Sequence, residues 1–336
     1  MRKLRLLLFP LAGIYYLVTL VRNKLYDIGF LTSKKYKIPV ICIGNLSVGG
    51  TGKSPMTEFV IRLLSNDYNV ATLSRGYGRK SKGYLDVHPD NKAVMVGDEP
   101  LQFAQKFDAI QVAVCEDRQI GIEKLLAKDI VPDIIILDDA YQHRKVEAGF
   151  YILLTSFNEL YSDDFLLPSG NLREPRAGAC RADVVIVTKC PDNVSHQEQV
   201  TIKEALKLKQ NQSIYFSKIS YDEQVFHEAG AVPLNRLKVK KVTLVTGIAN
   251  PKPLAAYLKK QGLSFTHQAY KDHHNFSNVE IDELEKLDCI LTTEKDYVRL
   301  RPLLKMQSLY YLPIKLQFLG NDEKLIIEIK NYVSSV

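Results

Sequence analysis

An eight-residue stretch, Ser-Val-Gly-Gly-Thr-Gly-Lys-Ser at positions 47–54, constrains the fold more strongly than any other part of the chain. The apolar run at 38–43 precedes it and is typical of a buried strand, and residues 55–64 follow with apolar side chains at helical spacing. A strand, a glycine-rich turn and a helix in this order form the usual context of a phosphate-binding loop. The sequence therefore predicts an α/β sheet with an anion site at this turn.

The residue types in this stretch suit the phosphates of a nucleoside triphosphate. Its glycines let backbone N–H groups crowd around a phosphate, Lys53 can reach the β- and γ-phosphates, and the Ser54 hydroxyl can hold Mg²⁺. Ser47 departs from the usual pattern, which has glycine there, and the double glycine that follows can supply the flexibility. The expected phosphate-binding residues are Ser47, Val48, Gly49, Gly50, Thr51, Gly52, Lys53 and Ser54. The alternative is an ordinary glycine-rich turn with a surface lysine.

A second half of such a site is expected at the end of a neighbouring strand, because Mg²⁺ needs a carboxylate. Four consecutive apolar residues at 134–137 suit a parallel strand buried on both faces, and Asp138 and Asp139 follow directly. Ligands bind at this end of the strands in open α/β sheets. Either carboxylate can hold the metal while the other contacts a nucleophile, unless the two are solvated turn residues. Together the two motifs favour phosphoryl transfer or nucleotide hydrolysis.

The bulk composition narrows the possible partners. The 336 residues exceed one typical core and suffice for two domains, and the net charge of +7 suits an anionic partner. No basic run carries interleaved aromatic residues, so we expect no nucleic acid partner. The five cysteines are scattered and form no C-x-x-C pair, which favours free thiols over disulfides or a zinc site. The anionic partner that we expect is therefore a phospholipid surface or a phosphorylated substrate.

The sequence of the N-terminal segment favours a membrane surface as the partner. Residues 1–5 are basic, and 6–21 form an uncharged stretch that would be about 24 Å long as a helix, short of a bilayer core of roughly 30 Å. A secretory signal is disfavoured because no small-residue cleavage site follows. A core helix that begins at Pro10 remains an alternative. We favour a helix in the membrane interface, with Tyr15 and Tyr16 at headgroup level.

Three further loops carry candidate site residues. The basic loop at 74–80 follows a strand and can cradle a polar or phosphorylated substrate, or it is a solvated turn. Asp98 and Glu99 precede a helix expected from 101 to 107, where Asp98 can be an N-cap or where both acids can act on a nucleophile or metal. Arg118 follows the strand at 110–114 and is a candidate to stabilise transferred phosphoryl charge.

Alternating strands and helices predict a doubly wound, mostly parallel sheet of the P-loop NTPase type and a second, smaller α/β domain. A loop of the second domain carries His273, which can orient a proton-transfer group together with Asp272. The expected divisions are a membrane-interface helix at 1–30, a P-loop domain at 31–212, a β linker at 213–240 and the smaller domain at 241–336.

These motifs, in this order, resemble the tetraacyldisaccharide 4′-kinase family, the lipid A 4′-kinases of Gram-negative bacteria. The resemblance rests on the segments 44–55, 74–78, 97–100, 137–143, 167–170, 173–175, 272–274 and 292–296, which span most of the chain. The departures are Ser54, where the family usually has threonine, and Ala140, where glycine is common.

The resemblance implies ATP-dependent phosphorylation of the 4′-hydroxyl of a tetraacyldisaccharide 1-phosphate, which gives lipid IVA. It also implies a two-domain kinase held on the cytoplasmic face of the inner membrane by its N-terminal helix, on an anionic surface and without an obligate protein partner. Carried over, Asp98 and His273 form the dyad that activates the hydroxyl, while Asp138 and Asp139, with Glu99 and Ser54, handle Mg²⁺. The candidate substrate contacts are Asn45, Arg75, Tyr77, Arg118, Gln142, His143 and Arg173.

Two other classes compete with the kinase. A membrane-peripheral ATPase switch has a similar glycine-rich loop, but such switches carry a lysine where this chain has Val48, and they do not need a second α/β domain. A GTP-driven metal-delivery protein would be expected to show a His-rich tract or a C-x-x-C pair, and the chain has neither.

Overall fold

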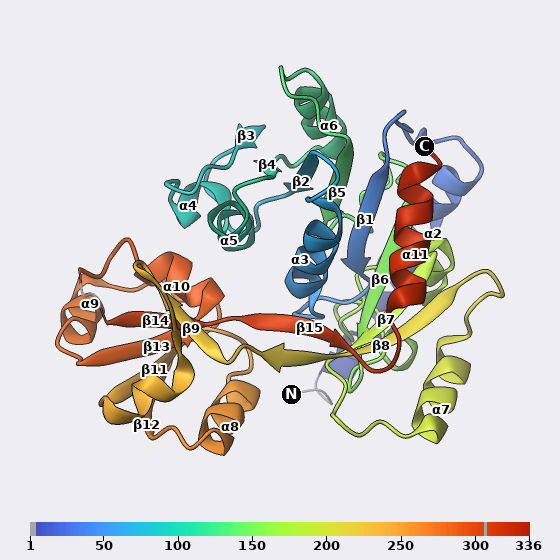
Figure 1. The fold of residues 1–336 in the computed structure, drawn as a ribbon. Helices are drawn as coiled ribbons and strands as arrows, with labels where there is room; N and C mark the ends of the chain where they lie inside the picture. The colour runs from blue at the N-terminus through green and yellow to red at the C-terminus, as the bar shows by residue number, and fades with distance from the viewer. Residues whose placement is uncertain (1–4, 306–307) are drawn as a thin grey trace.

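The computed structural model describes residues 5–305 and 308–336. Two sheets organise the chain, and Figure 1 shows them as separate bodies joined by the long strands β8 and β15. In spatial order the larger sheet holds β15 (Ile314–Phe318), β8 (Ser213–Tyr221), β7 (Val184–Thr188), β6 (Phe150–Ser156), β1 (Val40–Asn45), β5 (Ile134–Asp138), β2 (Val70–Ser74), β4 (Gln111–Val114) and β3 (Leu85–Asp86). The strands from β8 to β4 run parallel, and the edge strands β15 and β3 run antiparallel to their neighbours.

The central strands are buried on both faces, as their continuous apolar runs predict. Along β1, Cys42 belongs to the core on one face of the sheet, and Ile41 and Ile43 belong to the core on the other. The helices of this body are α2 (Phe9–Asp27), α3 (Lys53–Leu64), α4 (Ala93–Val96), α5 (Asp98–Lys106), α6 (Arg118–Leu126), α7 (His196–Leu206) and α11 (Glu323–Ser334), with 3₁₀ turns η1 (Leu6–Leu8), η2 (Tyr161–Asp163) and η3 (Arg176–Arg181). The doubly wound, mostly parallel sheet is confirmed.

The smaller body has its own sheet and core. Its strands lie in the order β10 (Gly230–Pro233), β9 (Gln224–His227), β14 (Leu309–Leu312), β13 (Cys289–Thr293), β11 (Val242–Thr246) and β12 (Phe265–Ala269). The helices α8 (Lys252–Lys260), α9 (Asn278–Leu284) and α10 (Glu294–Leu300) and the 3₁₀ turn η4 (Leu234–Val239) complete it. Buried residues on the sheet's two faces form two clusters of their own.

The chain crosses between the two bodies twice, which shifts the expected boundaries. Strand β8, expected as the start of a linker, pairs with β7 in the larger sheet and with β15, where Tyr221 lies opposite Ile314. The chain returns to the larger body at β15, and α11 then buries its apolar face in that core. The Tyr332 hydroxyl donates to the Val40 carbonyl at 3.2 Å and accepts from the Val40 amide at 2.9 Å. The segment from 314 to 334 therefore packs with the larger sheet, not with the smaller domain expected at 241–336.

The N-terminal helix α2 lies on the surface of the larger body. It begins at Phe9, with Pro10 in its first turn, and ends at Asp27, and Ala12 and Thr19 are its buried residues. Its exposed large apolar side chains are Phe9, Leu11, Ile14, Tyr16, Leu17, Val18, Leu20 and Val21. The part of the chain that the structure describes contains no helix with both the length and the apolar character to cross a membrane. Residues 1–4 of the expected interface helix lie outside the described residues.

Candidate active site

The glycine-rich loop connects β1 to α3 at the carboxyl edge of the larger sheet. Gly49 and Gly52 both have positive φ, 105° and 86°, which a residue with a Cβ rarely adopts. The buried Asn45 amide donates to the Thr51 hydroxyl at 2.8 Å, and the Thr188 hydroxyl donates to the Thr51 carbonyl at 2.7 Å. These bonds hold the loop from β1 on one side and β7 on the other. The Lys189 ammonium group adds a bond to the carbonyl of Gly50.

Lys53 and Ser54 begin helix α3, so the helix N-terminus points at the loop. The Lys53 ammonium lies 3.5 Å from the Asn45 side-chain oxygen and 3.8 Å from an Asp139 carboxylate oxygen. Parallel pairing aligns Ile43 of β1 with Asp138 of β5. This register brings the glycine loop and the two aspartates, about 85 residues apart in sequence, to one edge of the sheet.

Asp138 and Asp139 lie in different environments although they are neighbours. Asp138 is 5% exposed and accepts a hydrogen bond from the Thr57 hydroxyl at 3.2 Å. Burial, together with the negative charge of Asp139, raises the pKa of Asp138 to about 7. Thr57, one turn after Lys53 on α3, was not anticipated from the sequence. Its spacing from the glycine loop is the signal that could have identified it.

Asp139 is half-exposed and has a backbone φ of 49°. Arg173 donates to the Asp139 carboxylate in a bidentate arrangement, with Nη2 2.6 Å from Oδ1 and Nη1 3.2 Å from Oδ2. Burial opposes ionisation, but the positive charges of Lys53 and Arg173 outweigh it and lower the pKa of Asp139. The pair thus offers one firmly ionised carboxylate and one that is close to neutral.

This donor set fits magnesium. Carboxylates at 138 and 139 and the hydroxyl of Ser54 are hard oxygen ligands, and a cation between the two acids would offset the burial and mutual repulsion that raise the pKa of Asp138. Among the residues that the structure describes, no group of three His, Cys, Asp or Glu side chains forms a complete metal cage. Mg²⁺ in kinases is usually held by one or two carboxylates, substrate phosphates and water, so it needs no such cage.

The Asp98 and His273 side chains meet across the two bodies. The His273 Nδ1 atom lies 3.0 Å from the Asp98 Oδ2 atom. Helix α5 begins at Asp98 itself and not near 101 as expected, and its N-cap residue is Gly97, so Asp98 is not the N-cap. His273 has a backbone φ of 58°, and the exposed Tyr77 ring meets its ring edge-on at 5.5 Å between centroids. Residues that the sequence placed in separate loops therefore share one cluster.

Two cations of helix α10 complete this cluster. Arg299 donates through Nε to Asp98 Oδ1 at 2.8 Å and through Nη2 to Asp98 Oδ2. Burial opposes ionisation of Asp98, but hydrogen bonds from Arg299 and His273 prevail and lower its pKa to about 2. Lys295 lies 2.8 Å from His273 Nε2 and 3.1 Å from a Glu99 carboxylate oxygen. The sequence had not singled out Arg299, although it lies one helical turn after Lys295 in the motif at 292–296.

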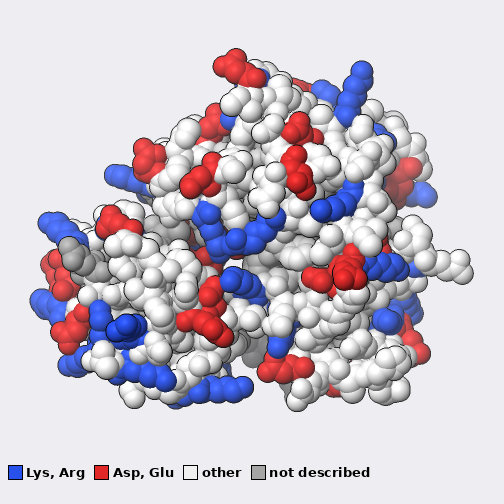
Figure 2. All heavy atoms as spheres, in the orientation of Figure 1, with Lys and Arg blue, Asp and Glu red and all other residues white. Residues whose placement is uncertain are grey.

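The remaining candidate residues separate into two groups. Asn45 and Arg173 lie at the glycine loop, and Gln142 bridges the Asn45 carbonyl at 2.8 Å and the Glu174 carboxylate at 2.9 Å. Arg75 is exposed in the loop after β2. Figure 2 shows a group of Lys and Arg side chains along the upper side of the hollow at the middle of this face, between the two bodies of Figure 1, with Asp and Glu side chains at its lower edges. A polyanionic ligand would meet favourable charge there.

Arg118 is buried, and His143 lies partly buried beside it. The Arg118 guanidinium is 3% exposed and donates to the carbonyl oxygens of Cys115 at 2.8 Å and Glu116 at 3.1 Å. Its backbone amide donates to His143 Nε2 at 3.2 Å, and burial lowers the pKa of His143 to about 4. His143 is thus neutral at physiological pH, and both side chains support the turn after β4 instead of projecting freely into the site.

Helix α2 contacts the loop that carries Arg173. The Tyr15 hydroxyl donates to the Arg173 carbonyl at 2.7 Å, and Asn23 donates to the Glu174 carboxylate at 3.2 Å. At the other end of the helix, Arg5 donates to the Pro168 carbonyl and to the Asn171 side chain, both at 2.9 Å. The helix that exposes the apolar surface is therefore bonded to the wall of the glycine-loop site.

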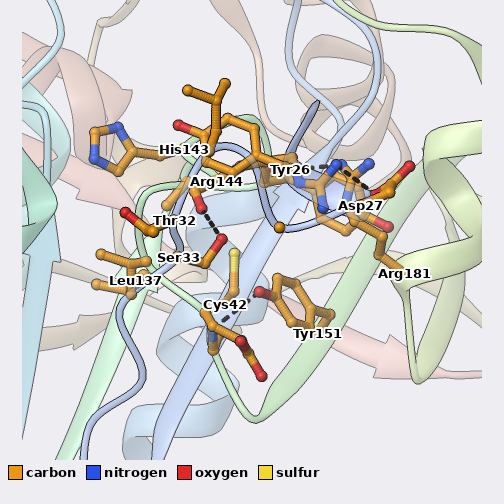
Figure 3. A pocket seen from close by; sticks show the side chains of 17 residues that line it. Tyr26, Asp27, Thr32, Ser33, Cys42, Leu137, His143, Arg144, Tyr151 and Arg181 are labelled. Carbon is orange, nitrogen blue, oxygen red and sulfur yellow. Dashed lines mark hydrogen bonds and ion pairs between the residues drawn. The ribbon is translucent and has the colours of Figure 1, made fainter. Parts of the chain in front are cut away.

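A cavity of about 600 Å³ lies beside this site, beyond the end of α2. Figure 3 shows Tyr151, Arg144 and Arg181 among the side chains that line it. Arg144 pairs with Asp27 at 2.8 Å, and Arg181 pairs with a Glu174 oxygen at 2.8 Å. Both guanidinium groups are thus paired with carboxylates of the chain itself.

Comparison with known proteins assigns the family. The family model for tetraacyldisaccharide-1-P 4′-kinase, LpxK, matches residues 4–334. The chain belongs to this kinase family. The tetraacyldisaccharide 4′-kinases of Flavobacterium psychrophilum and Flavobacterium johnsoniae are 50% and 48% identical to it, over 340 and 336 residues. These alignments cover 100% and 99% of this chain and 98% of each relative.

A solved structure agrees with the assignment. A crystal structure of LpxK from Aquifex aeolicus, described as an "apo" form in complex with ATP, is 32% identical and superposes with a TM-score of 0.81. The match covers 98% of this chain and 99% of that one. The LpxK resemblance and the kinase class expected from the motifs are thus confirmed, and neither the ATPase switch nor the metal-delivery protein is favoured.

Proposed function

We propose that this LpxK-family chain transfers the γ-phosphoryl group of ATP to the 4′-hydroxyl of a tetraacyldisaccharide 1-phosphate and so forms lipid IVA. Its relatives carry the name of that activity, and the Aquifex aeolicus relative was crystallised with ATP. The observation that carries the proposal is the 3.0 Å contact between Asp98 and His273, in a cluster that Glu99 and Lys295 also join. A nucleotide loop alone would serve an ATPase equally well, whereas this pair offers a group that can accept a hydroxyl proton.

The nucleotide would lie on the loop at 47–54. Backbone amides of the loop and the N-terminus of α3 would bind the phosphates, and Lys53 would contact the β- and γ-oxygens. Asp138, Asp139, Ser54 and Glu99 are the residues to hold Mg²⁺ or its waters, and the bound metal would neutralise charge on the phosphates. Arg173, which lies on Asp139, is placed to orient that carboxylate.

The hydroxyl would be activated at Asp98. A sugar hydroxyl is a far weaker acid than a carboxyl whose pKa is about 2, so Asp98 takes the proton late, as the bond to phosphorus forms. Before that point its role is to orient the hydroxyl oxygen toward the phosphorus atom. Because Asp98 and His273 come from different bodies, the complete site requires both bodies to be in contact.

The lipid substrate and the membrane would meet at α2. Its exposed apolar side chains suit the acyl region of a lipid interface, and the net charge of +7 suits an anionic surface. We assign the chain to the cytoplasmic face of the inner membrane as a peripheral or monotopic protein, with no nucleic acid and no obligate protein partner. The bonds from α2 to the Arg173 loop would place the acyl chains beside the phosphoryl-transfer site.

The test is transfer of label from [γ-³²P]ATP. Purified protein, Mg-ATP and detergent-solubilised tetraacyldisaccharide 1-phosphate are compared with a lipid-free control and with Asp98→Ala. Label in the lipid that the variant fails to transfer supports the proposal. Release of inorganic phosphate at one rate with or without lipid would refute it and would indicate an ATPase.

A further inference from the structure

Helix α10 presents two cations to opposite sides of the Asp98–His273 pair. Lys295 and Arg299 are four residues apart and therefore lie on one face of the helix. The Arg299 guanidinium contacts both oxygens of Asp98, and its side chain is 10% exposed. The Lys295 ammonium contacts the far nitrogen of the His273 ring. Arg299 Nη2 also lies 2.7 Å from His273 Nδ1, so His273 has a cation at each ring nitrogen and Arg299 contacts both members of the pair.

The contact with Lys295 influences where His273 carries its proton. An ammonium group has three donors and no acceptor, so in a hydrogen bond across the 2.8 Å contact with Lys295 the His273 Nε2 atom is the acceptor. A neutral imidazole that accepts at Nε2 carries its hydrogen on Nδ1, which lies 3.0 Å from the Asp98 carboxylate and 2.7 Å from Arg299 Nη2. A guanidinium also has donors and no acceptor, so Arg299 favours an unprotonated Nδ1 and Lys295 opposes it. Lys295 therefore favours the one tautomer that donates to Asp98.

The platform beneath these side chains is built by α10 itself. Asp296 accepts hydrogen bonds from the Gly247 amide at 2.9 Å and from the Thr293 hydroxyl at 2.8 Å. The Gly247 carbonyl in turn accepts from the His273 amide at 3.1 Å. The same helix thus holds the His273 backbone through Gly247 and the His273 ring through Lys295.

The helix is also fastened to the nucleotide body. Glu294, at the start of α10, lies 2.5 Å from the Lys106 ammonium of α5, and Lys106 lies 2.7 Å from Glu58 of α3. All three side chains are largely buried, which makes the connection stiff. Helix α5, which begins with Asp98, is thereby fixed to α10 at both of its ends.

We propose that Lys295 and Arg299 are positioning residues for phosphoryl transfer: Lys295 selects the Nδ1–H tautomer of His273, and Arg299 fixes the plane of the Asp98 carboxylate. The inference rests on the proposed function of the Asp98–His273 pair. Neither cation has to touch the substrate. Their effect is to hold the proton acceptor in a single orientation, and loss of about 1 Å of alignment costs roughly 100-fold in rate.

The test for Lys295 combines kinetics with a tautomer measurement. Lys295→Met keeps the length of the side chain and removes the donor, and Lys259→Met on the exposed face of α8 is the matched control. We expect kcat of Lys295→Met to fall roughly 100-fold while KM for ATP stays within about twofold. ¹⁵N NMR of histidine-labelled protein should show an unprotonated Nε2 at His273 in the parent and control, and a protonated Nε2 in the variant. An unchanged tautomer in Lys295→Met would overturn the assignment.

Arg299 is tested by rescue. Arg299→Gln should lower kcat with ATP affinity by calorimetry preserved, and Arg299→Lys should recover part of that loss because it restores one donor to Asp98. Equal activity of the two variants would exclude a positioning role, as would a loss that appears wholly in ATP affinity. If the parent protein transfers no phosphate to the lipid, the proposed function fails, while the NMR result still decides the role of Lys295.

Discussion

Replacement of Asp138 by asparagine should stabilise the protein above neutral pH, although the residue belongs to the proposed metal site. The folded chain raises the pKa of this carboxyl from 3.8 to about 7 through burial and the nearby Asp139 charge. The folded state therefore binds this proton more tightly than the unfolded state does. The stability of the folded state must fall as the pH rises from 3.8 to about 7. In this range the unfolded chain ionises freely, whereas ionisation in the folded chain places a negative charge in an unfavourable site.

The magnitude follows from the two pKa values. Each unit of difference corresponds to about 1.4 kcal/mol, so ionised Asp138 costs the folded state about 4 kcal/mol once the pH exceeds 7. Asparagine keeps an oxygen that can accept from the Thr57 hydroxyl and removes the charge. The advantage of Asp138→Asn should thus be near zero at pH 4, grow with pH, and level off above pH 7.

The assay is urea unfolding at a series of pH values in a buffer with EDTA, since a bound cation would itself favour ionised Asp138. Asp139→Asn is the matched control because the pKa of Asp139 is lowered by Lys53 and Arg173 against the effect of burial. Its charge stabilises the folded state at neutral pH, so this variant should be less stable than the parent there. That difference should disappear as the pH falls below the ordinary Asp value.

Two results would refute this reasoning. One is a free-energy difference between Asp138→Asn and the parent that does not change from pH 5 to pH 8. The other is destabilisation of the same size by both variants at pH 8. Either outcome would mean that other groups offset the cost of ionised Asp138 in the folded state. It would also mean that the charge of Asp139 does not raise the pKa of Asp138.

Three further predictions follow from single contacts. His273→Ala should lower kcat for lipid phosphorylation with ATP affinity nearly intact, and a large loss of ATP binding in calorimetry would contradict its assigned role. Leu17→Glu, at a side chain 59% exposed on α2, should weaken sedimentation with anionic vesicles without lowering the melting temperature; equal vesicle binding would exclude this face. Gly44→Ala should destabilise the fold, because its Cβ would lie 2.6 Å from Tyr141 Cβ; an unchanged urea midpoint would show that the loop yields.

The sequence predicted the nucleotide half of the site well because local patterns determine it. A strand, glycine turn and helix are contiguous, and the carboxyl ends of parallel strands must share an edge, which aligned Asp138 with the end of β1. Arg299 was missed for the opposite reason. Nothing in a lone arginine on a short helix indicates that it meets a carboxylate 201 positions away. Its helical spacing from Lys295 indicates only that the two side chains lie on one face of a helix.

The boundary between the two bodies could not be predicted from local sequence patterns either. The sequence predicted a second, smaller α/β domain, but β15 and α11 were not recognised as parts of the first body. The helical spacing of apolar residues in α11 indicates that the helix has one buried face. The spacing does not indicate which of the two cores that face packs against. The Tyr332 hydroxyl bonds to Val40, 292 positions away, and only the folded chain shows this contact.

The charged side chains of the site are paired with one another, so a charged ligand has to replace some of these pairs when it binds. Asp98 is paired with Arg299, Asp139 with Arg173 and Lys53, and Glu99 with Lys295. These internal pairs offset the cost of holding carboxylates and cations in a partly buried cleft. A metal ion that takes Asp139 would release Lys53 for the phosphate oxygens, so metal and phosphates should bind with positive cooperativity. The arrangement thus explains how one set of side chains can serve both the folded protein and a highly charged ligand.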